Sequence, residues 1–233
     1  MNTFEVKRIQ DRETILSLVS VRPAHKEIEN EILDMFVASG ALLQGHFKLE
    51  SGQHSSLFTR FADIAGNSSF ARKIAERLID ELKRDGVVVD SVMTQESAGH
   101  VIGDLIANKL GKRMVIVETD DHNRPTTNIV NETTLYPGDN VLIVIDLATT
   151  GSSLKTMVSL VRNKKANPSA IAIFATRNKE ALSEFERREG IKIYALVDLA
   201  LRESTYGVPG KDAGEEECEI CRQGKPSIPS WQI

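Results

Sequence analysis

Residues 141–153 constrain the fold most, because they read as a buried strand, a small polar turn and the start of a helix. The five apolar residues from Val141 to Ile145 predict a strand buried on both faces, as in parallel sheets. Asp146 follows at the carboxyl end of this strand, where open α/β sheets bind their ligands. From Leu154 to Val161, apolar residues recur at helical spacing. The segment therefore predicts one strand–turn–helix unit of a parallel α/β sheet.

The turn has the chemistry of a phosphate site. It consists of Thr149, Thr150, Gly151, Ser152 and Ser153. Backbone N–H groups at a helix start attract a phosphate dianion, hydroxyls add donors, and a glycine allows close approach. The alternative is that the Thr and Ser residues merely cap the helix. The turn is not a Walker loop, which needs Gly-Lys-Ser/Thr, nor a dinucleotide fingerprint, which needs three spaced glycines.

Strands and helices alternate after residue 86 in the manner of a doubly wound domain. The expected strands cover residues 87–93, 114–117, 141–145, 170–175 and 191–197, and the expected helices lie at about 99–110, 152–164 and 179–189. Two helices precede them, one ending before Gly40 and one running from Asn67 to Gly86. Residues 118–134 are polar with little periodicity, which predicts an active-site lid or flexible flap.

Composition places the chain among globular proteins. Its 233 residues, 41% of them hydrophobic, suffice for one domain, or one domain with a small hood. No stretch approaches the roughly 18 to 20 apolar residues of a membrane span, and the N-terminus lacks a signal peptide's apolar region, so we expect a cytoplasmic protein. The net charge of −4 and the pI near 5.8 argue against general nucleic-acid affinity.

At this point the sequence resembles a known family. Residues 141–153 are similar to the signature of type I phosphoribosyltransferases, usually an acidic pair, two variable residues and Thr-Thr-Gly. Upstream, Gly40-Ala41-Leu42 and the run from Gly45 to Ser55 resemble the opening of orotate phosphoribosyltransferases. Residues 137–140 and the tail from Cys218 to Pro226 also resemble that branch. The likeness covers about residues 30–229 and implies a central, mostly parallel sheet flanked by helices, with a small N-terminal hood.

The resemblance implies an organisation and a reaction. Residues 1–25 are expected to form an N-terminal arm, available to an oligomer or a protein partner. Residues 26–212 would form the domain, with a hood at about 40–62 and a flap at about 118–134, and residues 213–233 a tail. The implied reaction transfers a phosphoribosyl group from PRPP to a pyrimidine-like base, with Mg²⁺, in a homodimer. No metal ligand is assigned to the protein itself.

The implied site residues follow the family motifs. The turn of Thr149, Thr150, Gly151, Ser152 and Ser153 would bind the 5-phosphate of PRPP or of a nucleotide, and Asp146 would accept hydrogen bonds from the ribose hydroxyls. Arg124 and His122 would cover the pyrophosphate. The hood turn of Ser51, Gly52, Gln53, His54 and Ser55 would meet the base.

The chain also departs from the family, each time with less positive charge or metal support near pyrophosphate. Ile145 replaces the first acid of the pair, and Thr94–Gly99 carries Glu96 where the family has Gly-Pro-small-x-Gly-Gly. The flap holds Arg124 and His122 among three acids, and Glu50 and Gln53 stand where some orotate enzymes carry Lys and Arg. These changes leave two interpretations.

One interpretation is that Arg124, Arg60 or an arginine of a second subunit compensates, and the protein is a working transferase. The other is a catalytically degenerate nucleotide-binding or regulatory protein, or an effector subunit of a larger complex such as a defence system. The second would use its N-terminal arm to reach the complex. The two interpretations differ in whether pyrophosphate is released.

Cysteine and histidine spacing carries a weaker signal. Cys218-x-x-Cys221 supplies half a structural zinc site, and no histidine follows at finger spacing. We expect a local feature of the tail, with a redox pair or a site completed by a second subunit as alternatives. His46 and His54, in a polar turn, are expected to face solvent or bond to backbone. No Ser-His-Asp set supports a hydrolase.

Overall fold

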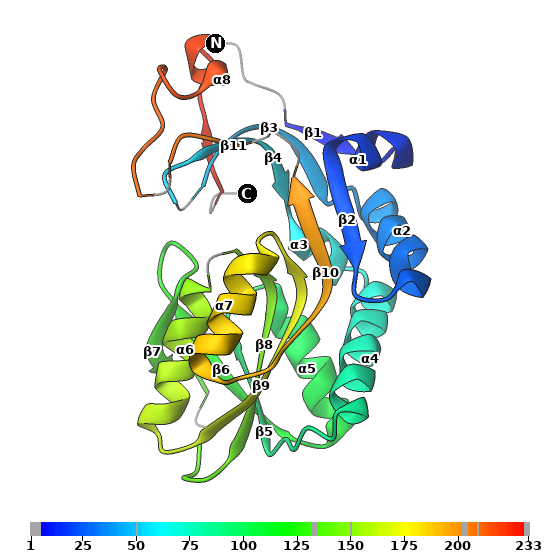
Figure 1. Cartoon of the computed structure of the whole chain (residues 1–233), viewed down its shortest axis with the longest axis vertical. Coiled ribbons are helices and arrows are strands. Elements are labelled where there is room, and N and C mark those ends of the chain that lie inside the picture. The colour runs from blue at the N-terminus through cyan, green and yellow to red at the C-terminus, as the bar shows by residue number, and fades with distance from the viewer. Residues whose placement is uncertain are drawn as a thin grey trace. The chain divides into compact units, whose positions relative to one another are not determined.

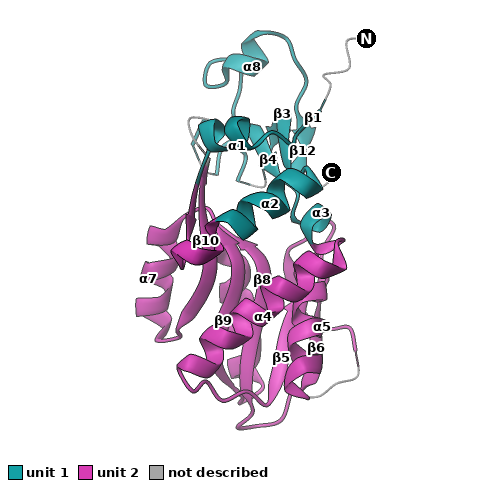
Figure 2. Cartoon of the chain, turned by 90° about the vertical axis from the view of Figure 1, so that its right-hand side faces the viewer, with its two compact units in different colours: residues 1–20, 30–64, 201–233 teal, residues 21–29, 65–200 magenta. Residues whose placement is uncertain are grey.

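The computed structural model describes residues 6–49, 51–131, 135–149, 151–201, 205–208 and 210–230. The chain divides into two compact units (Figure 2), unit 1 with residues 1–20, 30–64 and 201–233, and unit 2 with residues 21–29 and 65–200. Within the described ranges, every helix is too short or too polar to cross a membrane. The boundaries expected for arm, domain and tail stay a prediction.

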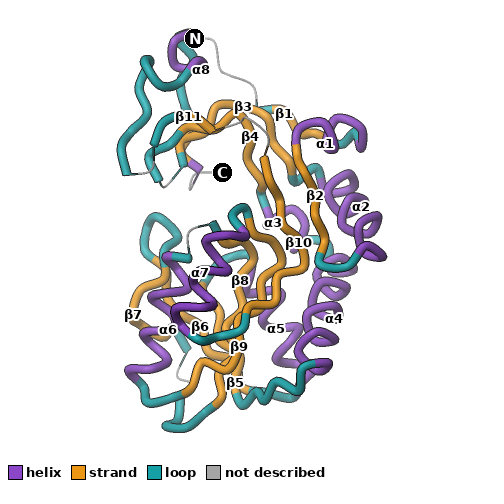
Figure 3. Tube along the Cα trace, in the orientation of Figure 1, coloured by secondary structure: helices purple, strands orange, loops and turns teal. Residues whose placement is uncertain are grey.

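Unit 2 is built around a seven-stranded sheet of order β2-β10-β9-β8-β5-β6-β7 (Figures 1 and 3). The strands are β2 Val19–Pro23, β5 Ser91–Gln95, β6 Arg113–Thr119, β7 Pro125–Ile129, β8 Asn140–Ala148, β9 Asn167–Thr176 and β10 Ile193–Leu201. The neighbours from β10 to β6 pair in parallel, whereas β7 is antiparallel to β6. The predicted α/β fold with a mostly parallel sheet is confirmed.

Helices cover both faces of this sheet. They are α4 Ser68–Arg84, α5 Gly99–Leu110, α6 Ser152–Asn163 and α7 Lys179–Glu189. Apolar residues of α6 and α7, such as Leu154 and Phe185, form one core with Met93, Ile143 and Ile173 of the strands. Helix α5 packs against β5, β8 and β6 and beside α4. Strands covered on both sides must be apolar throughout, which explains the apolar runs in the sequence.

The strand expected at residues 87–93 begins only at Ser91. Helix α4 ends at Arg84, and Gly86, two residues later, has the left-handed φ of +66°. The amide of Val87 then donates to Leu82 O at 2.9 Å, so it closes the helix instead of joining the sheet. Val88 is 61% exposed, which also excludes a buried strand at this point.

Tyr194 ties strand β10 to the end of α4. Tyr194 is 7% exposed, and its hydroxyl donates to Asp85 Oδ2 at 2.8 Å. Burial and the nearby Asp85 carboxylate raise the pKa of Tyr194, so the donor proton is retained. We expect Tyr194→Phe to lower the free energy of unfolding by about 0.5–1.5 kcal/mol, measured by urea denaturation. Tyr136→Phe is the control because Tyr136 is 56% exposed; an equal loss there would contradict this role.

The polar segment after β6 differs from the irregular lid expected from its sequence. Its described part forms a hairpin in which β7 pairs with β6, with Thr119 opposite Pro125. Asn123, with φ of +59°, makes the turn, and the Asn131 side chain bonds to the backbone of β6 at Met114 and Ile116. Residues 132–134 lie outside the described part of the chain. A role as a flap stays a prediction.

Unit 1 contains a smaller sheet of order β1-β3-β4-β11, with β12 also paired to β3. Its elements are β1 Lys7–Ile9, α1 Arg12–Leu18, α2 Glu29–Ser39, β3 Leu42–Lys48, β4 His54–Thr59, α3 Phe61–Ala65, β11 Thr205–Tyr206, α8 Glu219–Arg222 and β12 Ile228–Pro229. Strand β1 pairs with Leu42–Gln44, and β12 with Phe47 and Lys48. Segments from both ends of the chain thus join one hairpin. Whether the expected arm meets a partner stays a prediction.

Candidate functional site

The predicted phosphate turn lies at the start of α6 in unit 2. Gly151 is the N-cap, with φ of +76°, and Lys155 N donates to Gly151 O at 3.0 Å. The first turn of α6 holds no acidic residue. The N-cap position is thus occupied by glycine, which has no side chain to bond the helix amides, rather than by one of the Thr or Ser residues of the alternative interpretation. Thr150 lies outside the described residues, and phosphate binding by the turn stays a prediction.

Close packing fixes Gly151 in place. A Cβ atom at this position would lie 3.1 Å from Cδ2 of Phe185, and Gly151 is buried. Both the positive φ and the nearby ring therefore require glycine here. Replacing Gly151 would therefore disturb the backbone at the start of α6.

Asp146 lies within β8, because this strand extends to Ala148 rather than ending at Ile145 as expected. The residue is half-buried. Burial raises the pKa of Asp146, while hydrogen bonds from the amides of Leu147 and of Asp146 itself oppose the rise. The carboxyl group is thus partly desolvated, a setting in which it bonds strongly to hydroxyl donors.

The loop after β5 packs directly against Asp146. A Cβ on Gly99, the first residue of α5, would lie 2.8 Å from Asp146 N and 3.2 Å from Ile145 C. The connection from β5 to α5 therefore approaches the end of β8 that carries the carboxylate. Glu96, the acid expected to oppose pyrophosphate, is exposed and accepts from Thr119 N at 3.4 Å.

The charges of the hairpin turn pair with one another. Arg124 Nη2 lies 2.7 Å from Asp120 Oδ2, and its Nε donates to the same oxygen at 2.8 Å. These bonds lower the pKa of Asp120 to about 2. The amide of His122 also donates to Asp120. The positive charge of Arg124 is therefore partly neutralised by Asp120 of the same turn. The pyrophosphate roles of Arg124 and His122 stay predictions.

Arg177 is a cation that the sequence reasoning missed. It follows the last residue of β9, and its amide donates to Ala148 O, the last residue of β8, at 2.9 Å. The side-chain Nε and Nη2 atoms are shielded from solvent, and burial lowers the pKa of Arg177 to about 10. The sequence held part of the signal, because Arg177 directly follows an apolar strand and neighbouring parallel strands end at one edge. Which strands are neighbours was not evident from the sequence.

The expected base turn belongs to unit 1 and is bound to the segment before α8. Gln53 Nε2 donates to Gly207 O at 3.1 Å, and Gly52, with φ of +81°, would place a Cβ 2.7 Å from Lys211 O. His54 and Ser55 are buried, as is His46. The expectation that each histidine faces solvent or bonds to backbone is confirmed for His46, whose Nδ1 bonds to Lys225 O. It is wrong for His54, which is buried and contacts the side chains of His46 and Cys221. Contact of this turn with a base stays a prediction.

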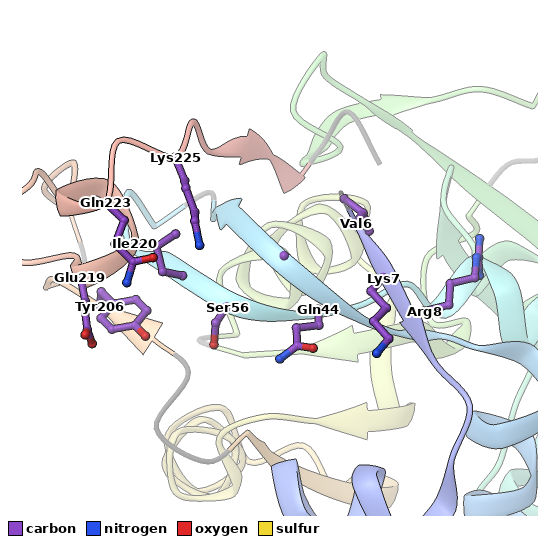
Figure 4. Close-up of a pocket in the computed structure, with 11 residues that line it drawn as sticks. Val6, Lys7, Arg8, Gln44, Ser56, Tyr206, Glu219, Ile220, Gln223 and Lys225 are labelled. Atoms are coloured by element: carbon purple, nitrogen blue, oxygen red, sulfur yellow. The ribbon is translucent and has the colours of Figure 1, made fainter. Parts of the chain in front are cut away.

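A cavity of about 790 Å³ also lies in unit 1 (Figure 4). Its wall includes Lys7, Gln44, Tyr206 and Lys225, from β1, β3, β11 and the segment after α8. Among the described residues, those predicted to contact phosphate, ribose or base take no part in this lining. The cavity is therefore separate from the predicted substrate contacts.

Known proteins similar to this chain include phosphoribosyltransferases. The family described as phosphoribosyl transferase domain matches residues 65–194. The orotate phosphoribosyltransferase of Desulforamulus reducens is 26% identical over 198 residues, covering 85% of this chain and 94% of that protein. The enzyme of the same name from Thermus thermophilus is 29% identical over 206 residues, covering 84% and 97%.

Solved structures match at the level of the fold. Orotate phosphoribosyltransferase from Aeropyrum pernix superposes with a TM-score of 0.56 at 23% identity, covering 69% of this chain and 89% of that one. The UMP synthase of Leishmania donovani gives a TM-score of 0.58 at 20% identity, covering 71% of this chain and 35% of that one. Since the family match spans more than half of the chain and includes both Asp146 and Gly151, this protein belongs to the type I phosphoribosyltransferase family and resembles its orotate phosphoribosyltransferases.

Proposed function

We propose that this protein transfers the phosphoribosyl group of PRPP to a pyrimidine-like base, giving a nucleoside 5'-monophosphate and pyrophosphate. The observation that carries the proposal is the glycine-capped start of α6 beside Asp146, within a chain similar to orotate phosphoribosyltransferases. The degenerate nucleotide-binding or effector interpretation gains no support from the relatives. That the acceptor is a pyrimidine-like base is also part of the proposal, and the hood turn Ser51–Ser55 remains the predicted contact for that base.

In this proposal the start of α6 binds the 5-phosphate. Amides of the first helical turn and the helix dipole favour a dianion, and no acidic side chain in that turn opposes it. The hydroxyls of Thr149, Ser152 and Ser153 add donors, with Thr150 as the predicted fourth. The Gly151 cap, packed against Phe185, would allow the phosphate to approach the backbone closely.

Asp146 is proposed to accept hydrogen bonds from the ribose hydroxyls. The family implies Mg²⁺, which binds hard oxygen ligands and is usually held by one or two carboxylates plus substrate phosphates. One desolvated carboxylate, Asp146, at a strand end fits such an ion, whose other ligands would come from PRPP and water. When bound, Mg²⁺ neutralises charge that develops on the departing pyrophosphate.

Arg177 is proposed as a fixed positive charge for an anionic part of the substrate. A cation shielded from water interacts more strongly with an anion than an exposed one does. Arg124, 60% exposed at its side chain and bonded to Asp120, is less suited to this task. Arg177 would offset part of the charge that the chain lacks relative to its family.

The test is release of pyrophosphate from PRPP with Mg²⁺ and a panel of bases led by orotate, with mass detection of the monophosphate. We expect base-dependent release. We expect Asp146→Asn to lower kcat/KM by about 10- to 100-fold, the value of a hydrogen bond to a charged group. Asp121→Asn, an exposed acid of the hairpin turn, is the matched control and should be unchanged.

The pH profile adds an independent readout. Burial raises the pKa of Asp146, so kcat/KM should fall as the pH drops through a value above the ordinary aspartate pKa of about 3.9. This acid limb should be absent in Asp146→Asn. Release without any base, or silence at high enzyme concentration, would reject the transferase proposal.

A further inference from the structure

Four potential metal ligands meet in unit 1, outside the residues proposed to bind phosphate and ribose. They are His46 of β3, His54 at the start of β4, Cys218 before α8 and Cys221 within α8. One ligand atom from each side chain lies within 4.8 Å of all the others. His46 and Cys218 are fully buried, and His54 is 5% exposed. Residues far apart in the sequence thus form one enclosed cluster.

Four of the distances are close to the edges of a small tetrahedron, and the two others are at most 4.8 Å. His46 Nε2 lies 3.0 Å from His54 Nδ1 and 3.4 Å from Cys218 Sγ. Cys221 Sγ lies 3.2 Å from His54 Nδ1 and 3.7 Å from His46 Nε2. Bond lengths of about 2.05 Å to nitrogen and 2.3 Å to sulfur give tetrahedral edges of about 3.3 to 3.8 Å. Only small side-chain movements would bring four atoms to one central ion.

The outer nitrogen of His46 is also arranged as in a metal site. His46 Nδ1 lies 2.8 Å from the carbonyl oxygen of Lys225, which can only accept a hydrogen bond. The proton of the neutral ring is therefore assigned to Nδ1, and Nε2 directs its lone pair at the cluster. Ligating histidines are commonly oriented by such a bond to a carbonyl.

We propose that His46, His54, Cys218 and Cys221 bind one structural Zn²⁺ ion. Two nitrogen and two sulfur ligands are typical of tetrahedral zinc, whereas Mg²⁺ and Ca²⁺ take oxygen ligands. All four positions come from the protein, so the site is closed and not catalytic. Two thiolates balance the charge of the ion, and the two thiol protons leave to solvent on binding.

The site would fasten the C-terminal segment to the β3–β4 hairpin. The segment has little other regular structure in its described part, since α8 spans Glu219–Arg222 and β12 only Ile228–Pro229. Short elements with a small core are often held by a metal or a disulfide. The ion would also fix Ile220, Gln223 and Lys225, which form one wall of the cavity in Figure 4. His54 would then serve the metal and not the base.

A disulfide between Cys218 and Cys221 is the competing use of these thiols. Both cysteines are free in the structure and are the chain's two cysteines. A disulfide would use both thiols and would not explain why two buried histidines direct their ring nitrogens toward them. Zinc uses all four side chains at once.

The experiment measures zinc in the full chain purified under reducing conditions from zinc-supplemented medium. We expect about one zinc ion per chain by plasma mass spectrometry. Cys218→Ser and His54→Asn should lose most of it, whereas the exposed neighbour Glu219→Ser and the remote His25→Asn should keep it. Circular dichroism checks that each variant is folded.

A second measurement needs no variant. A chelator should remove the zinc and lower the Tm by at least about 5 °C, and added zinc should restore it. Cobalt(II) in the stripped protein should give the visible absorption of a tetrahedral thiolate site. Wild-type protein that carries no zinc and takes up neither metal, or variants that retain as much zinc as wild type, would overturn the assignment. These readouts do not depend on the transferase activity.

Discussion

Replacing Gly151 with valine is expected to weaken the binding of ribose 5-phosphate at least about 100-fold, which corresponds to about 2.7 kcal/mol. Gly151 has φ of +76°, where a β-branched residue costs about 1–3 kcal/mol of strain. Its Cβ would also lie 3.1 Å from the ring of Phe185, and the two methyl groups of valine add bulk beyond it, so the ring or the start of α6 must move. Amides that move no longer converge on the phosphate. Isothermal titration calorimetry with ribose 5-phosphate measures the loss.

The matched control is Gly190→Val. Gly190 has a similar φ of +68° and caps the end of α7, but nothing lies within 4 Å of a Cβ there. It should therefore lose stability without losing affinity. Gly151→Ala, a smaller change, should fall between wild type and valine. Unchanged affinity in a folded Gly151→Val protein would show that phosphate binds elsewhere.

The regular parts of the fold were predictable because their signals are local. Helix α5 begins at Gly99 and ends at Leu110, and α7 spans Lys179–Glu189, as the spacing of apolar residues indicated. The buried strands appeared as apolar runs since both of their faces are covered. Strand β7 was missed because it lies at the edge of the sheet, where Thr126, Thr127 and Asn128 need no apolar alternation.

Contacts between distant residues could not be predicted in the same way. His46 and Cys218 are 172 positions apart, and the structure brings them within 3.4 Å because β3 and the C-terminal segment share one sheet. From spacing alone, Cys218 and Cys221 supplied only half a zinc site. The choice of partner strand far away in the sequence, which no local pattern encodes, decides which side chains meet.

In the candidate site, too, residues of one continuous segment were predictable and residues brought together by strand pairing were not. The phosphate turn and Asp146 stood out because one continuous segment carries them. Arg177 was not found, since its proximity to Ala148 depends on the pairing of β8 with β9. If Arg177 faces the substrate as proposed, it offsets part of the charge deficit inferred from Glu96 and the hairpin, and that deficit stays a prediction. The arginines considered from the sequence, Arg124 and Arg60, did not include the half-buried Arg177, which follows β9.

Gly99→Ala is expected to lower kcat/KM for pyrophosphate release by about 10- to 100-fold, because misplacement of reacting groups by about 1 Å has that effect. The new Cβ would lie 2.8 Å from Asp146 N, a backbone atom that cannot rotate away. Either α5 or the end of β8 must move. The amide concerned helps to hold the pKa of Asp146 down, so the acid limb of the pH profile should shift upward as well.

Gly103→Ala, one turn further along α5, separates this effect from a general loss of packing. Its Cβ would meet side-chain atoms of Thr94 and Met114 at 3.2 to 3.4 Å, which can adjust. Both variants should lose about 1–3 kcal/mol of stability at most, as overpacked cores do. A fall in kcat/KM and a moved acid limb in Gly99→Ala alone would link the loop after β5 to the carboxylate. Equal effects in both variants would mean that this loop only supports the fold.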